Sequence, residues 1–297
     1  MNLWRRALAD RRVALSGALL LALALAAGLA PLLAALTDAS AYKVDLYHLL
    51  EAPSLRHPLG TDELGRDLLL RLLDGGRVSL LVGITAALTA ALLGTAIGLV
   101  AGYRGGRLDA ALMRFTDGVI ALPILPLLII LAAIDLKKLG LPQVIVQSEA
   151  VSLYRIIVLV ALFGWTTVAR LVRGAALSLR AQDFVRAAVA LGASPRRIML
   201  VHILPNLASS IIVATTLSVG NIILLESVLS FLGLGISPPL ASWGNMLTGA
   251  QETISRAPQL AIYPGLLIFV TVIACNFLGD GLQEALDPRG SMRRPTQ

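Results

Sequence analysis

The residues of this chain whose types could do chemistry are few, and their spacing builds no catalytic or metal site. The three histidines (His48, His57 and His202) are far apart, and the single cysteine, Cys275, lies in an apolar run. A structural zinc site needs about four such ligands held close together, and one cysteine excludes an intrachain disulfide. We therefore expect no metal, no cofactor, no catalytic residue and no enzymatic activity of its own.

The most unusual setting for a polar side chain is that of Glu226, which directly follows an apolar run. A carboxylate at such a depth is costly in lipid, so it should face protein or water. At helical spacing, Thr215, Ser218 and Asn221 fall within a broad arc on the same side, and Asn276 lies in a later apolar run. These polar residues either line a path for a polar substrate or hold neighbouring helices together. The sequence leaves both interpretations open.

The elements that must position these residues are membrane-spanning helices. Of the 297 residues, 57% are hydrophobic and only 14% are charged, well below the quarter or so typical of soluble domains. A span of the hydrocarbon core needs about 20 mostly apolar residues in a helix. Six stretches meet that test, namely 13–36, 78–102, 118–134, 151–169, 207–225 and 260–278. The sequence therefore predicts an all-α, polytopic membrane protein with six spans.

The charge distribution predicts the orientation of these spans. The net charge of +7 would suggest a nucleic-acid partner in a soluble protein, but in a membrane protein it bears on which side faces the cytoplasm. Placing both termini inside puts 16 of the 25 Lys and Arg residues on the inner side. Because short inner loops carry the positive excess, both termini should be cytoplasmic. Asp117 and Asp280 then fall at cytoplasmic span ends, where solvated charges need no special role.

Two outer segments have helical patterns of their own. In the first, from His57, Thr61 or Asp62 can cap a short surface helix, with an apolar stripe including Leu64 and with Arg66, Asp67 and Arg71 facing away. The second covers about 241–255, and its apolar face includes Trp243, Met246 and Leu247. This second helix is either a lid over the outer mouth of the bundle or an interfacial helix held by Trp243.

The inner segment between the fourth and fifth spans predicts a helical elbow. A short helix from Asp183 should end at Gly192, in a left-handed conformation. Ser194 should cap a second helix that begins with Pro195 and is stopped by Pro205. An elbow joined to two spans could convert a push from a cytoplasmic partner into a helix movement. The alternative is an ordinary connecting hairpin.

The spacing within this elbow resembles the loop of importer permeases of the ATP-binding-cassette (ABC) class. That pattern is Glu-Ala-Ala, three residues, Gly, nine residues, Ile, one residue and Leu-Pro. This chain has Ala187, Ala188, Gly192, Leu204 and Pro205 in place, with Arg186 instead of Glu and His202 instead of Ile. The surroundings resemble the second permease of the dipeptide and oligopeptide systems. The matching runs are 57–67, 229–235, 242–247 and 278–289.

This resemblance implies a specific assembly in a bacterial inner membrane. Two different permeases of the type I importer kind pair in the lipid, two ATP-binding subunits dock on their elbows, and an extracytoplasmic binding protein delivers substrate. The coupling residues implied are Arg186, Ala187, Ala188, Gly192, Ser194, Pro195, Leu204 and Pro205. ATP and Mg would be bound by the partners, because this chain has no Gly-x-x-x-x-Gly-Lys-Ser/Thr loop. No nucleic-acid partner is implied.

The expected organisation has three parts. Residues 1–77 hold the N-terminal cytoplasmic segment, the first span and the outer amphipathic segment. Residues 78–290 form the permease domain, with the coupling loop at 174–206, and residues 291–297 form a cytoplasmic tail. The resemblance implies di- or oligopeptides as substrates, with glutathione or a nickel chelate as alternatives. A secondary transporter or a channel subunit is the alternative from another class, although no internal repeat supports the former.

Overall fold

The computed structural model describes residues 10–37, 40–140, 142–146 and 148–286, and these residues form helices and loops with no β-strand. The N-terminal residues 1–9 and the predicted tail 291–297 lie outside them. The helices are α2 (Arg11–Gly28), α3 (Ala30–Thr37), α4 (Leu68–Arg104), α5 (Gly106–Ala121), α6 (Ile124–Ala132), α7 (Gln143–Val146), α8 (Glu149–Arg180), α9 (Asp183–Ala190), α10 (Pro195–Arg197), α11 (Leu204–Phe231), α12 (Trp243–Ala250) and α13 (Gln259–Leu286). A 3₁₀ turn, Leu136–Leu139, and a π-helical segment, Ile198–Ile203, complete the described elements.

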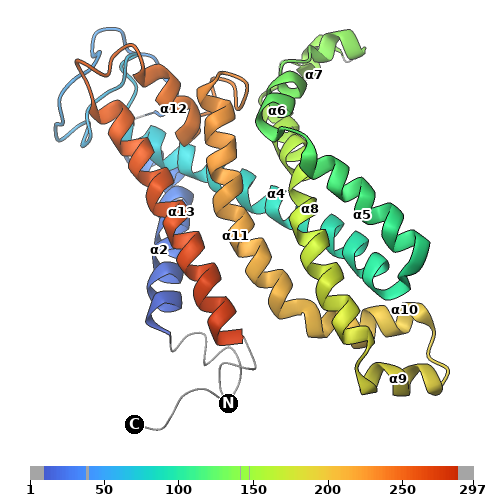
Figure 1. The fold of residues 1–297 in the computed structure, drawn as a ribbon. Coiled ribbons are helices and arrows are strands. Elements are labelled where there is room, and N and C mark those ends of the chain that lie inside the picture. The colour runs from blue at the N-terminus through green and yellow to red at the C-terminus, as the bar shows by residue number, and fades with distance from the viewer. Residues whose placement is uncertain (1–9, 38–39, 141, 147, 287–297) are drawn as a thin grey trace.

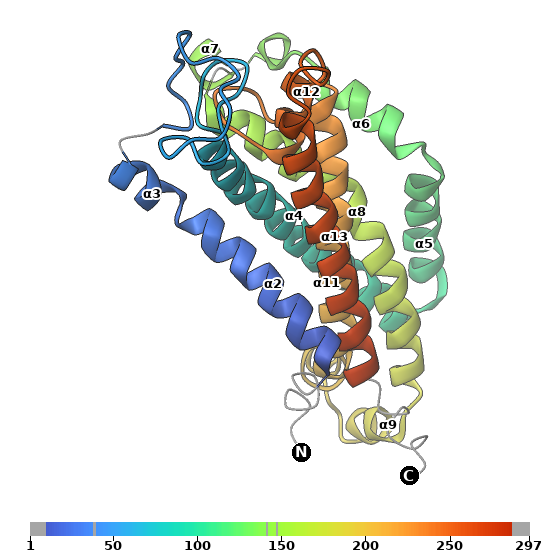
Figure 2. The same ribbon diagram turned by 90° about the vertical axis from the view of Figure 1, so that its left-hand side faces the viewer.

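The long helices form a tilted bundle with shorter helices and loops at each end (Figure 1). Helices α2 and α13 lie on one flank and α5 on the opposite flank. In the second view α2 and α5 again lie on opposite sides, with α13 between them in front (Figure 2). The outer segment and α12 gather at one end of the bundle, and α9 and α10 lie at the other. The start of α2 and the end of α13 lie at the α9 end. This placement agrees with termini on the same side as the elbow.

The number of spans is confirmed with one change in shape. Within the described residues, five helices are long and apolar enough to cross a membrane, and α5 with α6 makes a sixth if the bent pair is one span. The sequence predicted a single helix over 118–134, but α5 and α6 meet at 80°. Pro123 explains the break, because a proline restricts the residue before it and cannot donate a helical hydrogen bond. Leu122 accordingly adopts an extended backbone.

The most extensive helix contact in the bundle joins α4 to α8, and it contains three glycines spaced four apart. A Cβ atom added at Gly94, Gly98 or Gly102 would lie 2.4–2.7 Å from atoms of α8, such as the Trp165 and Ala169 carbonyl oxygens. Only glycine therefore lets these two helices approach so closely, as is common between membrane helices. This small-residue repeat was visible in the sequence, and it sets the position of the helix that leads into the elbow.

The first outer segment does not form the predicted surface helix. Gly60 and Gly65 adopt positive φ angles of 82° and 72° and turn the chain back on itself. Helix formation starts only at Leu68, where the Asp67 carboxylate accepts a hydrogen bond from the Leu70 amide at 2.8 Å. From there α4 runs unbroken across positions 77 and 78 into the second span.

The charged residues that were expected to face away from this segment are buried instead. Arg66, Asp67 and Arg71 are all buried. Arg66 Nε donates to Asp62 Oδ2 at 2.7 Å, and Arg71 Nε lies 3.1 Å from the same oxygen. The prediction from helical periodicity that these residues are exposed is therefore wrong, because ion pairing within the segment allows the charged groups to be buried.

Candidate functional site

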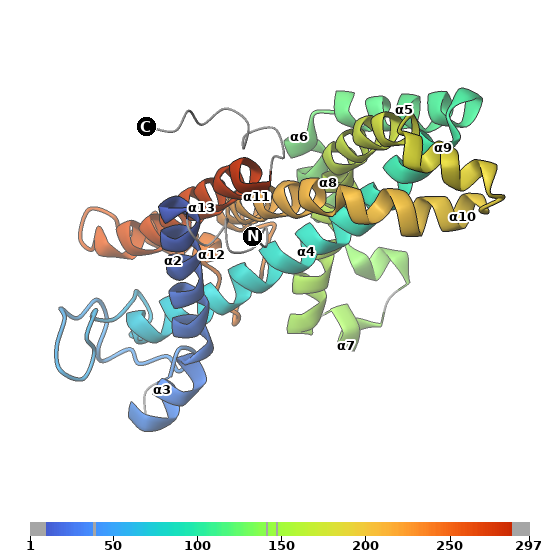
Figure 3. The same ribbon diagram turned by 90° about the horizontal axis from the view of Figure 1, so that it is seen from below.

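The cytoplasmic elbow has the predicted local structure over most of its length. Helix α9 begins at Asp183, and Gly192 has a φ of 78°, the left-handed conformation expected at that position. Ser194 Oγ accepts a hydrogen bond from the Arg197 amide, and Pro195 occupies the first turn of α10. The two arms lie at the lower end of the bundle in Figure 1, and Figure 3 shows them side by side.

The predicted stop at Pro205 is wrong. Helix α10 continues through the π-helical segment Ile198–Ile203 directly into α11. The Leu204 amide donates to the Met199 carbonyl, five residues back. This wider turn lets the chain accommodate a proline that lacks its own amide hydrogen. The second arm of the elbow and the fifth span are therefore one mechanical piece.

The elbow is packed onto the bundle by a shared apolar core. Val185 and Ala188 from α9 contact a cluster that includes Ile198, Ile203 and Val172. This cluster joins both arms of the elbow to α8 and to the cytoplasmic end of α4. Because packed side chains transmit displacement with little compression, a force on the elbow can move α8 and α11 together.

The two alanines of the elbow have different environments. Ala188 was expected to pack against a partner, but it is only 7% exposed and lies between the arms of its own elbow. Ala187, Phe184 and Leu191 fall on one side of α9 and are exposed, Leu191 by 88%. Sequence reasoning missed Phe184 and Leu191, although large apolar residues on the side of a helix opposite its buried side were a usable signal. Arg186 is also exposed.

The polar residues proposed for a translocation path are not brought together. Glu226 is fully buried, whereas Asn221 is exposed on the same helix, and Ser218 donates within α11 to the Ala214 carbonyl. Asn276 is half-buried on α13. Among the described residues, no hydrogen bond joins any of the other three to Glu226.

Glu226 instead connects three elements near the outer end of the bundle. Its Oε1 accepts a hydrogen bond from Ser230 Oγ at 2.6 Å, and Ser79 Oγ on α4 lies 3.4 Å from Oε2. Ser79 Oγ in turn accepts from the Trp243 amide, the first residue of α12. The carboxylate is thus enclosed by protein and satisfied by hydroxyl groups, which is the arrangement that holds helices together.

The outer helix α12 is shorter than predicted and is firmly fixed. Ser242 and Asn245 form a reciprocal capping box at its start. The Trp243 ring fits against Gly76, where an added Cβ would lie 2.8 Å from the ring, and its Nε1 donates to the Leu72 carbonyl. Trp243 and Met246 are buried, and Leu247 packs beside them. The predicted apolar face is confirmed as far as Ala250, but Ile254, which was predicted to continue it, lies beyond α12 and is exposed.

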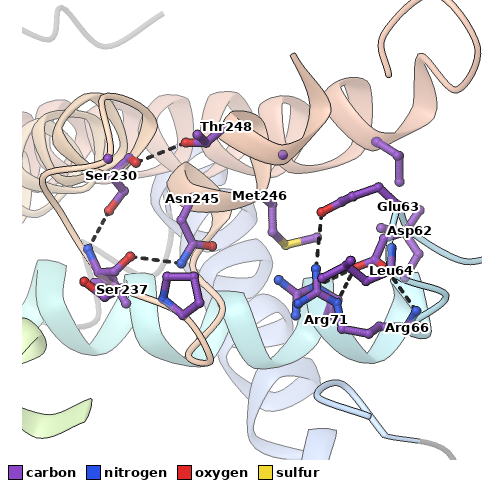
Figure 4. Close-up of a pocket in the computed structure, with 16 residues that line it drawn as sticks. Asp62, Glu63, Leu64, Arg66, Arg71, Ser230, Ser237, Asn245, Met246 and Thr248 are labelled. Atoms are coloured by element: carbon purple, nitrogen blue, oxygen red, sulfur yellow. Dashed lines mark hydrogen bonds and ion pairs between the residues drawn. The ribbon is translucent and has the colours of Figure 1, made fainter. Parts of the chain in front are cut away.

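A cavity of about 280 Å³ lies between α12, the loop after α11 and the outer segment (Figure 4). Its two sides differ in chemistry. Asp62, Arg66 and Arg71 form the charged side, while Ser230 and Asn245 lie on the other. The Asn245 amide nitrogen already has hydrogen-bond partners within the protein, because Nδ2 donates to the Ile236 and Leu240 carbonyls. The lid and interfacial interpretations of α12 both remain predictions.

Comparison with known proteins decides the family. Residues 94–291 match the family described as the binding-protein-dependent transport system inner membrane component. The chain belongs to this family. It is therefore a multi-pass inner-membrane permease subunit of an ABC importer, and such a subunit works with partner subunits.

Three similar proteins illustrate the relationship. The oligopeptide transport system permease protein OppC of Bacillus subtilis is 38% identical over 253 residues, covering 84% of this chain and 78% of that protein. The OppC of Haemophilus influenzae is 38% identical over 80% of this chain and 73% of its own length. The glutathione transport system permease protein GsiD of Escherichia coli O6:K15:H31 is 40% identical over 96% of this chain and 89% of its own length.

Proposed function

We propose that this chain pairs with a second, homologous permease to form the membrane path of an importer for small peptides. Each elbow of the pair docks on one of two cytoplasmic ATP-binding subunits, which bind the ATP and Mg. An extracytoplasmic binding protein delivers the peptide to the outer end. This chain carries no catalytic group and binds no cofactor in this scheme.

The observation that carries the proposal is the construction of the elbow. Its two arms are fixed at an angle by Gly192, share one apolar core with α8, and continue into α11 without a break. Phe184, Ala187 and Leu191 form an exposed apolar patch on the side of α9 that faces away from the bundle core. A rigid lever with an apolar end fits a subunit that is driven from the cytoplasm. A secondary transporter or a channel has no need of it.

The substrate class follows from the similar proteins. Two of them are named for oligopeptides and one for glutathione. Glutathione is itself a tripeptide, so a short peptide with free carboxylates covers both. The nickel chelate predicted as an alternative finds no support among these names.

The test is reconstitution of the complete importer in proteoliposomes. The chain is co-expressed with its second permease, the ATP-binding subunits and the binding protein, and uptake of a dipeptide, a tetrapeptide and glutathione is measured. We expect uptake only with ATP and the binding protein, and we expect the ATP-binding subunits to co-purify with the permease pair. Proton-driven uptake by the permease without ATP-binding subunits would contradict the proposal and favour a secondary transporter.

A further inference from the structure

Helix α5 presents an unusual face for a membrane helix. It packs on α4 and α8 through the side that carries the buried residues Asp109 and Thr116. The opposite side has mainly charged and small residues, all of them exposed, namely Arg107, Ala110, Ala111, Arg114, Gly118 and Ala121. The exposed side chains of Phe115 and Leu122 lie along one edge of it. Helix α5 lies at the edge of the subunit, on the flank away from α2 and α13 (Figure 1).

An ion pair extends this polar face far along the helix. Asp117 was predicted at a span end, but it lies 11 positions after Gly106, about 16 Å along α5. Its carboxylate pairs with Arg170 of α8, and both side chains are about half exposed, by 55% and 50%. A second pair, Arg173 with Asp109, is bidentate at 2.5 and 2.7 Å and fixes α5 to α8 below it.

These charges exclude lipid as the neighbour of this face. Charged side chains within a membrane face protein or water, because transfer into hydrocarbon is costly. The break between α5 and α6 leads to the same conclusion. Leu122 and Pro123, the two residues between α5 and α6, are exposed in this chain, and irregular backbone at membrane depth is tolerated only against protein or a water-filled space.

Water fits the face better than a tightly packed partner helix. Arg107 and Arg114 have no ion-pair partner among the described residues, and burying either against another subunit would leave a charge uncompensated. The charged positions also follow one another from the cytoplasmic end of α5 up to Asp117. Water can therefore reach every one of them from the cytoplasm.

We infer that this face of α5, with Arg170 of α8, lines the cytoplasmic half of the translocation path and meets the charged ends of the passing peptide. The inference rests on the proposed function. Three arginines (Arg107, Arg114 and Arg170) against one aspartate (Asp117) give the face an excess of positive charge. Such a path attracts a substrate with a free carboxylate. The Asp117–Arg170 pair supplies one partner for each end of a zwitterionic peptide.

The test is the reactivity of cysteines placed on the face of the assembled importer, in a Cys275→Ala background. Gly118→Cys is suitable because an added Cβ there meets nothing within 4 Å, and Ala121→Cys is a second position on the same face. Inside-out vesicles are treated with a negatively or a positively charged thiosulfonate. A thiol reacts as the thiolate, which forms in water. We expect both cysteines to react within about tenfold of the rate of Arg196→Cys in the elbow, measured in the permease pair without ATP-binding subunits.

The matched control is Leu92→Cys on α4, which replaces an apolar side chain that is 73% exposed in this chain. It should react at least about a hundredfold more slowly, because lipid or an apolar partner surrounds it. If both cysteines on the α5 face are unreactive in the complex but reactive in the separated chain, the face contacts the partner permease. No reaction in either state would assign it to lipid. Each result overturns the inference.

The charge of the path is tested with one further change. The anionic reagent should modify Gly118→Cys faster than the cationic reagent does. Adding Arg114→Glu, one turn away, should lower that rate ratio by about tenfold. An unchanged ratio would overturn the electrostatic part of the inference. ATP-driven uptake and co-purification by the unmodified importer report on the proposed function separately, so either failure can be recognised.

Discussion

The two adjacent alanines of the elbow should fail in different ways when each is replaced by aspartate. Ala188 lies in the core that joins the two arms, whereas Ala187 is on the exposed side of α9 with Phe184 and Leu191. Ala188→Asp should disrupt the elbow itself. Ala187→Asp should leave the elbow folded and should weaken only its contact with an ATP-binding subunit.

The expected magnitudes follow from burial. An uncompensated charge in the Ala188 position costs about 3–5 kcal/mol, enough to open the packing of Val185 on Ile198. At the exposed Ala187 position, the same carboxylate changes the stability of the separate permease by less than about 0.5 kcal/mol. If Ala187 instead lies in an apolar contact with an ATP-binding subunit, the aspartate reduces the binding free energy by about 2–4 kcal/mol, which weakens binding by roughly 30- to 1,000-fold.

Two measurements separate these outcomes. Trypsin cleavage at Arg186, Arg196 or Arg197 in the permease pair without ATP-binding subunits reports whether the elbow is folded, and affinity for those subunits reports docking. Ala188→Asp should increase cleavage, and Ala187→Asp should not. The control is Val189→Asp, an exposed apolar residue on another side of α9, which lies near Arg104 and Arg180. This change should leave both measurements unaltered.

The reasoning would be refuted by either of two results. Wild-type protease resistance in Ala188→Asp would mean that the core between the arms does not hold the elbow together. Wild-type affinity and uptake in Ala187→Asp would mean that the patch of Phe184, Ala187 and Leu191 does not contact the ATP-binding subunit.

Three further changes test other parts of the structure. Gly192→Val places a β-branched residue at a φ of 78°, so uptake should fall at least about tenfold while both permeases still insert; normal uptake would contradict the assigned bend. Glu226→Ala removes the acceptor for Ser230 and should lower the yield of assembled complex, because each buried hydroxyl left without a partner costs about 1–3 kcal/mol of stability. A normal yield with reduced uptake would instead favour a role in the translocation path. In a Cys275→Ala background, Gln251→Cys should react with an impermeant reagent in intact cells and Arg196→Cys only after lysis, and the reverse pattern would invert the topology.

The sequence alone determined the class of the fold and much of its local structure. Apolar length predicts spans because lipid offers no hydrogen bonds to an unpaired backbone. Local rules of the same kind predicted the bend at Gly192, the cap at Ser194 and the apolar face of α12. These features depend on residues close to one another in the chain, so a linear pattern contains the necessary information.

Tertiary packing decided what the linear pattern left open. Arg66 and Arg71 looked exposed by periodicity, but both are buried with Asp62 because a folded-back loop supplies the compensating charge. Glu226 and Asn221 lie five positions apart, yet only the neighbouring helices decide that one is enclosed and the other exposed. The same holds for Ala187 and Ala188 in the elbow. Which side of a helix is covered depends on residues distant in the sequence, and only the folded chain brings those residues together.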